Sequence, residues 1–309
     1  MKEIFPSYYP EFRCIAGACR HSCCIGWEID IDEETLSGYD DPALPLYDRL
    51  QKNIDRAQTP HFCLAEGERC PFLNTDGLCD IIIHRGEESL CQICDDHPRF
   101  RNFFSDRTET GLGLCCEAAA ELILFWSEPV FWTEEETAEE TFPLTEEEKE
   151  FLSLRDEIYQ LLQNRSVPIE KRFEKVLILC GSTLPEKTYS EWAMIYKNLE
   201  RLDPAWDTML DLIAGDSELL VCGNIQRWPV QLENLAVYFV FRHLAGSLDD
   251  DRLAARAAFC ILSVLIIKKL WQKQGTADME TLTETVRLYS SEIEYSEDNL
   301  ETLLSLLEQ

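Results

Sequence analysis

The sequence predicts a mainly α-helical protein in which a cysteine-rich, loop-rich metal-binding module at the N-terminus is followed by an all-helical C-terminal region. Eleven of the 14 cysteines lie within the first 116 residues. Beyond residue 145, apolar residues recur at helical spacing. Nine glutamates lie between residues 134 and 150, and a charge block of this kind is typical of a solvated connector. We therefore expect a cysteine-rich metal- or Fe–S-binding domain over residues 1–130, an acidic connector over 131–150 and a helical domain over 151–309.

The cysteines of the first part fall into short-spaced groups. The stretch CIAGACRHSCC places four of them in the pattern C-x4-C-x3-C-C, and the stretches CPFLNTDGLC, CQICDDHPR and LCC follow in that order. Thiolates that are spaced by a few residues around turns can converge on one metal centre. These groups are therefore suited to binding Zn²⁺ or an Fe–S cluster.

The start of the chain bears on the oxidation state of these cysteines. The stretch MKEIFPSYYPEFRC contains a single lysine and no apolar segment as long as that of a secretory signal, so we expect a cytoplasmic protein. Cytosolic thiols are kept reduced, and a dense cysteine set there is more often a metal or cluster site than a disulfide framework. Disulfides and scattered thiols are the alternatives. The cysteines expected to pack as small apolar side chains are Cys63, Cys91, Cys180, Cys222 and Cys260.

Composition narrows the classes of partner. The chain has 309 residues, of which 45% are hydrophobic, so it can bury a substantial core. Its net charge of −30 repels nucleic-acid phosphates and attracts cationic partners. The longest apolar stretch, AAFCILSVLIIKKLW, is shorter than the ~20 residues that span a bilayer, so we expect a buried helix and no transmembrane segment.

Several helices can be placed in the second part. Thr145 and Glu148 are spaced as a capping box at the start of the first of these helices. Further helices are expected over PIEKRFEKVLILC, DPAWDTMLDLIAG, LENLAVYFVFRHLAG, DDDRLAARAAFCILSVLIIKKLW, METLTETVRLYSSEI and SEDNLETLLSLLE. No Gly-rich phosphate loop and no CxxxCxxC triplet occurs in the sequence, which argues against an ordinary Rossmann-type methyltransferase and against a radical enzyme of that pattern.

Several of these stretches, taken in order, carry a family resemblance. YYPEFRCIAGACRHSCCIGWEIDID, CPFL, DGLCDI, HPR, LCCEAA and LENLAVYFVFRHL together resemble the flagellin lysine-N-methylase family, often called FliB. The cysteine-rich part also resembles the broader group of zinc- or iron-chelating domains with a CxxCxxCC-type motif. The resemblance spans most of the chain.

The resemblance implies an enzyme of the bacterial flagellum that transfers a methyl group from S-adenosylmethionine to lysine side chains of flagellin. It also implies an Fe–S cluster, of the 4Fe-4S type, with zinc as the alternative. One cluster with structural thiols, two centres, or a zinc pair would each fit the number of cysteines. The cysteines that match the family pattern as metal ligands are Cys14, Cys19, Cys23, Cys24, Cys70, Cys79, Cys94 and Cys115.

The sequence departs from the family pattern at two positions. His97 stands where a tyrosine often precedes the Pro-Arg pair, and Cys116 replaces the usual proline, so both could themselves bind metal. A non-enzymatic zinc- or iron-chelating or Fe–S protein with the same cysteine scaffold is the main alternative function. A zinc-stabilised interaction module is a third.

No spacing in the sequence identifies a catalytic base or the residues that bind S-adenosylmethionine. A lysine must lose its proton before it can attack a methyl group, so a methylase needs desolvation or a base. Glu233, Asn234, Arg242 and His243 lie on a largely apolar predicted helix, where they either make satisfied core contacts or line a pocket. In the stretch SEIEYSEDNLETLL, serine and aspartate fit a cap for the last helix.

Overall fold

The computed structural model describes the whole chain except residues 139, 224, 276–277 and 309. It divides into two compact units. The larger one combines Met1–Phe12 with Phe100–Gln309, and the smaller one consists of Arg13–Arg99. The smaller unit is therefore an insertion between two parts of the chain that fold together.

A four-stranded sheet, which the sequence analysis did not predict, ties the N-terminus to the larger unit. The strand order is β4-β5-β1-β6, with β1 parallel to β5 and antiparallel to β6. Ile4 of β1 lies opposite Glu109 on one side and Glu134 on the other. The strands are β1 (Lys2–Pro6), β4 (Arg99–Phe103), β5 (Arg107–Leu112) and β6 (Trp132–Glu136).

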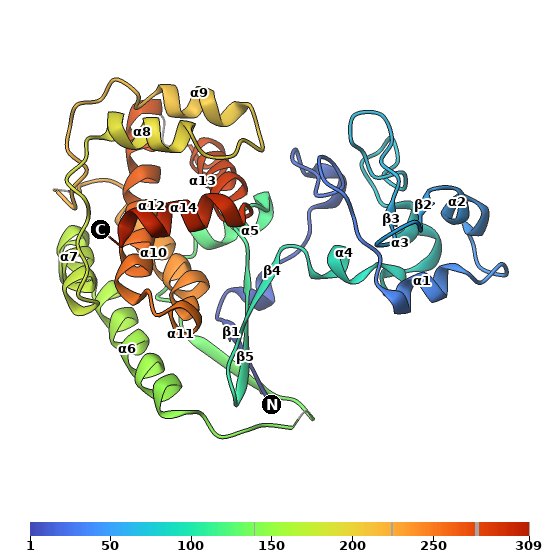
Figure 1. The fold of residues 1–309 in the computed structure, drawn as a ribbon, viewed down its shortest axis with the longest axis horizontal. Helices are drawn as coiled ribbons and strands as arrows, with labels where there is room; N and C mark the ends of the chain where they lie inside the picture. Colours follow the sequence, from blue (N-terminus) through green and yellow to red (C-terminus); the bar gives the residue numbers. More distant parts are fainter. Residues whose placement is uncertain (139, 224, 276–277, 309) are drawn as a thin grey trace. The chain divides into compact units, whose positions relative to one another are not determined.

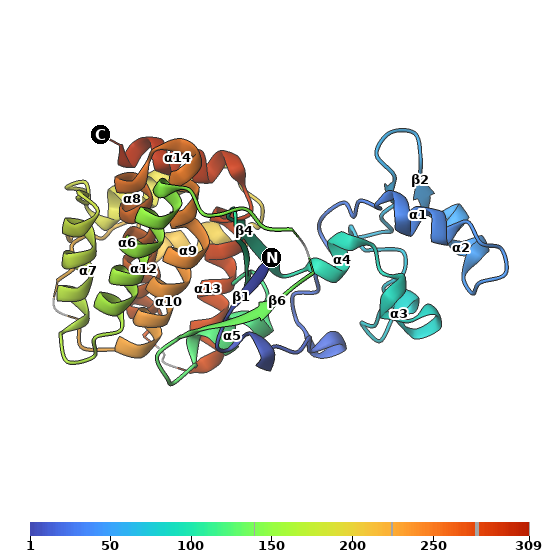
Figure 2. The same cartoon turned by 90° about the horizontal axis from the view of Figure 1, so that it is seen from below.

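Helices form the remainder of the larger unit, as predicted for the C-terminal region. From α6 onward, every regular element in the described residues is a helix. Figures 1 and 2 show α6 and α7 along one side of this unit and the sheet along the other. The helices are α5 (Glu117–Leu124), α6 (Glu146–Leu162), α7 (Ile169–Leu179), α8 (Tyr189–Lys197), α9 (Ala205–Asp211), α10 (Pro229–His243), α11 (Ser247–Asp250), α12 (Leu253–Gln274), α13 (Met279–Ile293) and α14 (Glu297–Leu307).

The central helix of this unit is α12, which contains the longest apolar stretch. It is buried on all sides from Ala257 to Trp271, as expected of a helix whose residues are apolar around its whole circumference. Among the described residues, no helix is both long and apolar enough to cross a membrane. The capping box predicted at Thr145 and Glu148 is confirmed at the start of α6.

The two units divide the chain at different places from the predicted domains. Residues 100–130 were placed with the cysteine-rich part, but Leu112, Leu114 and Ile123 belong to the same apolar core as the helices. The stretch 131–150 was placed as a connector, but it supplies β6 and the first turn of α6. The stretch folds as a strand because the backbone of β6 pairs with β1 at the edge of the sheet, while its glutamate side chains remain exposed.

The smaller unit has short elements around a small core of its own. Its helices are short, and its two strands, β2 and β3, form one antiparallel pair. The core combines Ile29, Ile31, Tyr39, Leu50, Phe62 and Phe72 with buried Cys70 and Cys91. The elements are α1 (Glu33–Tyr39), α2 (Tyr47–Lys52), β2 (Ile54–Asp55), β3 (His61–Phe62), α3 (Asp80–Arg85) and α4 (Gln92–Asp96).

Candidate functional site

Five cysteines gather in the core of the smaller unit. Cys70 and Cys91 are buried in it, and Cys24, Cys79 and Cys94 pack against it. The backbone places them: the Cys70 N–H donates to the Cys24 carbonyl at 2.8 Å, and Cys79 and Cys91 immediately precede α3 and α4. We call these five side chains the thiol cluster.

The sulfurs of the thiol cluster are close enough to influence one another. Cys91 Sγ and Cys94 Sγ lie 3.3 Å apart. Burial raises the pKa of Cys70, and so do the neighbouring Cys24, Cys79 and Cys91, whose thiolates would repel a charge there; together these effects bring it to about 12. A bound metal cation would attract these thiolates and so offset the repulsion between them. Thiolates are also the form of cysteine that ligates metals.

The pKa is lowered at Cys24 and Cys91 and raised at the other three members of the thiol cluster. A hydrogen bond with the Cys23 thiol lowers the pKa of Cys24 to about 7, against the opposing effect of burial. In contrast, the hydrogen bond with Cys91, together with burial, raises the pKa of Cys94. Cys24 and Cys91 are therefore the thiols of this group that most readily supply a thiolate at neutral pH.

The donor chemistry of the thiol cluster fits a soft metal better than a hard one. Thiolates in an apolar surrounding suit zinc or an Fe–S cluster. In the described part of the chain, no three Cys, His, Asp or Glu side chains converge closely enough to hold a single metal ion. An Fe–S cluster binds its thiolates through different iron atoms, so its ligands need not converge on one point.

The predicted ligands are placed unequally. Four of them, Cys24, Cys70, Cys79 and Cys94, lie in the thiol cluster. Cys91 joins them, although the sequence analysis assigned it to packing; its C-x2-C spacing with Cys94 was the signal that could have identified it.

The other predicted ligands lie outside the thiol cluster. Cys14 and Cys23 are exposed and Cys19 is half-buried. Cys115 belongs to the larger unit, where burial raises its pKa to about 12 and Tyr295 hydrogen-bonds to its thiol. Burial lowers the pKa of His97 to about 4, which leaves its imidazole neutral at neutral pH.

A second cluster of polar side chains lies in the larger unit, where α10 meets the end of α13. Glu294 is fully buried and accepts a hydrogen bond from His243 Nε2 at 2.6 Å and from the Tyr238 hydroxyl at 3.0 Å. Arg242 pairs with Glu294 through Nε at 3.3 Å and donates to the Tyr238 hydroxyl at 2.9 Å. We call these four side chains the Glu294 network.

The Glu294 network has a defined charge state. Burial alone would raise the pKa of Glu294, but Arg242 and His243 hold it below its usual value. Burial lowers the pKa of His243, and the hydrogen bond to Glu294 offsets only part of this effect. A carboxylate, a guanidinium and a neutral imidazole are therefore held together at neutral pH.

The Glu294 network approaches the surface at Tyr295. The Arg242 guanidinium lies 4.8 Å from the centre of the Tyr295 ring and 5.0 Å from that of Phe100. Tyr295 is 46% exposed, whereas the Arg242 side chain is 11% exposed. Arg242 is thus held in place by two aromatic rings, one of which faces solvent.

The two remaining polar residues predicted on α10 make core contacts. Glu233 pairs with Arg165 at 3.0 Å and with Arg172 at 2.5 Å. Asn234 Nδ2 donates to the carbonyls at the end of α5, including that of Trp126 at 2.8 Å. Of the two interpretations left open by the sequence, the structural one therefore holds for these two residues.

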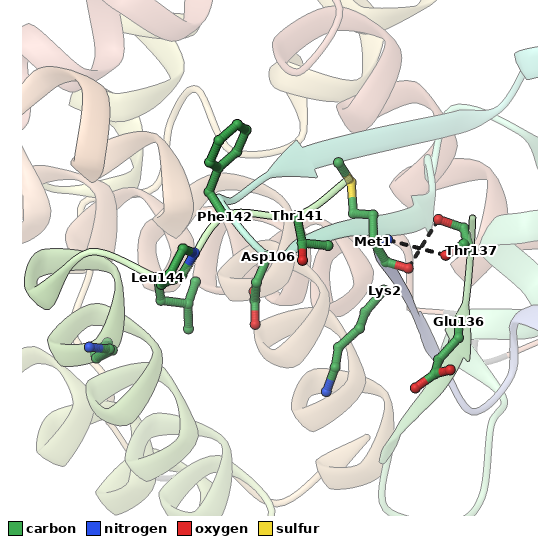
Figure 3. Close-up of a pocket in the computed structure, with 10 residues that line it drawn as sticks. Met1, Lys2, Asp106, Glu136, Thr137, Thr141, Phe142 and Leu144 are labelled. Atoms are coloured by element: carbon green, nitrogen blue, oxygen red, sulfur yellow. Dashed lines mark hydrogen bonds between the residues drawn. The ribbon is translucent and has the colours of Figure 1, made fainter. Parts of the chain in front are cut away.

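One open cavity of about 560 Å³ lies at the edge of the sheet in the larger unit. Figure 3 shows Met1 and Thr137 hydrogen-bonded across one part of it. None of the predicted ligands and no member of the Glu294 network lines this cavity.

Comparison with known proteins gives a family match for the part of the chain that contains the Glu294 network. Residues 194–309 match the FliB lysine N-methylase C-terminal domain. The resemblance to the FliB family is confirmed over part of the chain. Both stretches that meet at Glu294, in α10 and at the end of α13, lie inside the matched FliB domain.

The relatives agree with the FliB match. The lysine-N-methylase of Salmonella choleraesuis is 29% identical to this chain over 168 residues, and that of Salmonella typhimurium is 28% identical over the same length. Each alignment covers 50% of this chain and 42% of the relative, so the match spans less than half of these methylases. The flagellar biosynthetic protein FliU of Salmonella muenchen is 29% identical over 135 residues, which are 40% of this chain and 79% of that protein. The search of solved structures returned no match.

Proposed function

We propose that this chain is a protein lysine N-methylase that transfers a methyl group from S-adenosylmethionine to lysine side chains of flagellin, with the help of an Fe–S cluster. The observation that carries the proposal is the FliB lysine N-methylase C-terminal domain over residues 194–309. The names of the relatives, two lysine-N-methylases and one flagellar protein, support the reaction and the substrate.

The thiol cluster is the proposed place of the metal. Cys24, Cys70, Cys79, Cys91 and Cys94 supply more thiolates than the four that one cluster needs. When bound, an Fe–S cluster supplies a redox-active centre whose potential depends on hydrogen bonds to its sulfurs and on solvent exposure. The chain itself would supply the apolar side chains that surround these thiols and the lowered pKa of Cys24.

The Glu294 network is the proposed proton acceptor. The acceptor lysine is an ammonium at neutral pH and must be deprotonated before methyl transfer. Glu294 is held as a carboxylate and His243 as a neutral imidazole, which are the states that a general base requires. Tyr295 is the exposed residue through which the network is nearest to solvent.

Labelled methyl transfer tests this proposal. The full chain, purified without oxygen, is incubated with methyl-labelled S-adenosylmethionine and flagellin, and we expect label in methyl-lysine. Cys24→Ser should abolish labelling, whereas the matched variant Cys180→Ser should retain it, because Cys180 is buried in the larger unit outside the thiol cluster. Metal-replete protein that neither binds S-adenosylmethionine nor labels flagellin would exclude the proposal.

Salt provides a further arm of the same experiment. The net charge of −30 should attract a cationic, lysine-bearing surface. Screening shortens the range of this attraction from ~10 Å at 0.1 M salt to ~3 Å at 1 M. Labelling should therefore be slower at high salt, and an unchanged rate would argue against electrostatic attraction of the substrate.

A non-enzymatic metal or cluster protein is the second candidate function. It is favoured by one observation: the thiol cluster is complete within the smaller unit, whereas the match to the methylases covers 42% of their length. Binding of S-adenosylmethionine, measured by equilibrium dialysis on the metal-replete chain, separates the two functions. Binding supports the methylase, and metal without binding supports the alternative.

A further inference from the structure

Cys91 and Cys94 are a pair of thiols in direct contact within the thiol cluster. Their Sγ atoms are 3.3 Å apart across one turn of backbone, in which the N–H of Cys94 donates to the carbonyl of Cys91 at 2.9 Å. The backbone at this turn is anchored, since the N–H of Gln92 donates to Asp32 at 2.8 Å and the Tyr39 hydroxyl donates to the Ser89 carbonyl at 2.7 Å. The pair is thus held in contact by α1 as well as by α4.

The two thiols differ in their access to solvent. Cys91 is 1% exposed, whereas Cys94 is half-buried. A small thiol reagent from solution can therefore reach Cys94 more readily than Cys91. Cys91 is within reach of Cys94 from inside the core.

We propose that Cys91 and Cys94 form a reversible disulfide in the metal-free chain, and that this bond prevents metal from entering the thiol cluster. A disulfide needs its sulfurs about 2.05 Å apart, so the 3.3 Å contact requires only a short approach. The second half of the proposal rests on the proposed function, because it takes the thiol cluster as the metal site.

The reaction needs a disulfide oxidant of low molecular weight, such as glutathione disulfide. The accessible Cys94 thiol first gives up its proton to the buffer; the resulting thiolate attacks one sulfur of the oxidant, forms a mixed disulfide and releases one glutathione thiolate. The Cys91 thiolate then attacks the Cys94 sulfur, which forms the internal disulfide and releases the second glutathione. The two protons of the protein thiols end on the two glutathione thiols, so the two thiols are oxidised and one disulfide is reduced.

A disulfide between Cys23 and Cys24 is less favourable, although these thiols also share a hydrogen bond. Adjacent Cα atoms are about 3.8 Å apart, which is shorter than the ~4.4 to 6.8 Å usual between the Cα atoms of a disulfide. The C-x2-C spacing of Cys91 and Cys94 avoids this restriction.

Thiol trapping of the full chain tests the disulfide. The metal is removed with a chelator, the protein is equilibrated in buffers of increasing glutathione disulfide, and remaining thiols are blocked with N-ethylmaleimide. The peptide that contains Cys91 and Cys94 should pass from two adducts to none, with the loss of two hydrogen atoms, and reductant should reverse the change. Cys91→Ser should leave Cys94 bound to glutathione. The control variant Cys63→Ser, at an exposed position outside the thiol cluster, should behave as the parent chain.

Cobalt binding tests the second half. Reduced protein should bind Co²⁺ through the Cys91 and Cys94 thiolates, with thiolate absorption bands and with water in the remaining positions, and the oxidised protein should bind it only after reduction. Two adducts at every buffer composition, or a bond from Cys94 to Cys24, Cys70 or Cys79, would overturn the disulfide. Equal Co²⁺ binding by both forms would overturn the block on metal entry. Methyl transfer is not measured in either arm, so failure here is distinct from failure of the proposed methylase.

Discussion

Glu294 has a fully buried carboxylate that contacts Arg242, His243 and Tyr238. Removing one partner from a buried ion pair leaves the other charge unpaired, which typically costs ~3 kcal/mol. We therefore expect Glu294→Gln to lower the free energy of unfolding by about 3 kcal/mol in urea titrations. The control is Glu301→Gln, whose carboxylate pairs with Arg252 at the surface and whose loss should change the urea midpoint little. Equal midpoints for the two variants would show that the Glu294 network does not stabilise the fold.

His243 should make the stability of the chain depend on pH. Burial lowers its pKa, so the folded chain keeps the imidazole neutral, while an unfolded histidine binds a proton near pH 6.5. The free energy of unfolding should therefore fall as the pH drops below ~6.5, by at most ~1.4 kcal/mol per pH unit from this group. His243→Asn should reduce this slope in urea titrations between pH 7.5 and pH 5.5, roughly one unit on either side of the unfolded pKa. A variant with the slope of the parent chain would contradict the assignment.

At the scale of single residues, the spacing of the cysteine groups together with the family resemblance predicted part of the candidate site. Cys24, Cys70, Cys79 and Cys94 come from separate stretches of sequence, and the fold brings them into one core as the cysteine groups indicated. Cys91 was assigned to packing because a free cysteine often behaves as a small apolar side chain, although its C-x2-C spacing with Cys94 is also that of a ligand pair. Glu294 could not be connected with Arg242 from sequence, because their contact depends on how α10 and α13 pack.

Among the elements, α6 and α8 both start with a capping box, but the glutamate of the α6 box makes further hydrogen bonds outside its helix. In both, a threonine and a glutamate form a capping box, at Thr145 and Glu148 and at Thr188 and Glu191. Glu148 additionally accepts hydrogen bonds from the N–H and hydroxyl of Ser105, at 2.8 and 3.0 Å. It therefore fixes α6 to the turn between β4 and β5.

This difference predicts unequal effects of matched substitutions. Glu148→Ala should destabilise the chain by about 1 kcal/mol more than loss of the cap alone, because two further hydrogen bonds are lost. Glu191→Ala removes only the cap of α8 and should cost less. Thermal unfolding followed by circular dichroism compares the two, and a larger loss in Glu191→Ala would refute the role given to Ser105.

Helices were easier to predict than the sheet, for reasons visible in β1 and β5. The helices repeat apolar residues over several turns, whereas β1 has five residues and β5 contains the polar run RTET. Glu109 of β5 is buried and forms an ion pair with Arg155 of α6. A partner so far away in the sequence cannot be recognised from the alternation of polar and apolar residues in a strand. The cap of α8 had the same sequence signature as that of α6 and could have been predicted.

At the scale of the whole molecule, the chain leaves the larger unit at Phe12 and returns to it at Phe100. Composition placed the boundary near the glutamates because the cysteines end there, but strand pairing between β1, β5 and β6 fixes the units. A change in composition along the chain marks a domain boundary only when the strands that pair with each other lie on the same side of that change. Here β1 pairs with β6, which lies beyond the end of the cysteine-rich part.

This arrangement predicts which residues lose order when the metal is removed. Structural metal sites contribute their binding energy to folding. Chelation should therefore increase amide hydrogen exchange within Arg13–Arg99, while β1 and β5 keep the slow exchange of the larger unit. Hydrogen exchange with mass spectrometry measures both in one experiment. Loss of protection in β1 together with the smaller unit would contradict the division.

Whether the thiol cluster holds the metal is tested most directly by the visible spectrum of the chain purified without oxygen, with iron and sulfide measured on the same sample. We expect a brown protein that contains iron and sulfide. Cys70→Ser should lose both, because Cys70 is buried in the thiol cluster, and Cys180→Ser should keep both. A colourless protein with stoichiometric zinc, or a Cys70→Ser variant that keeps its iron, would contradict the assignment of an Fe–S cluster to these thiols.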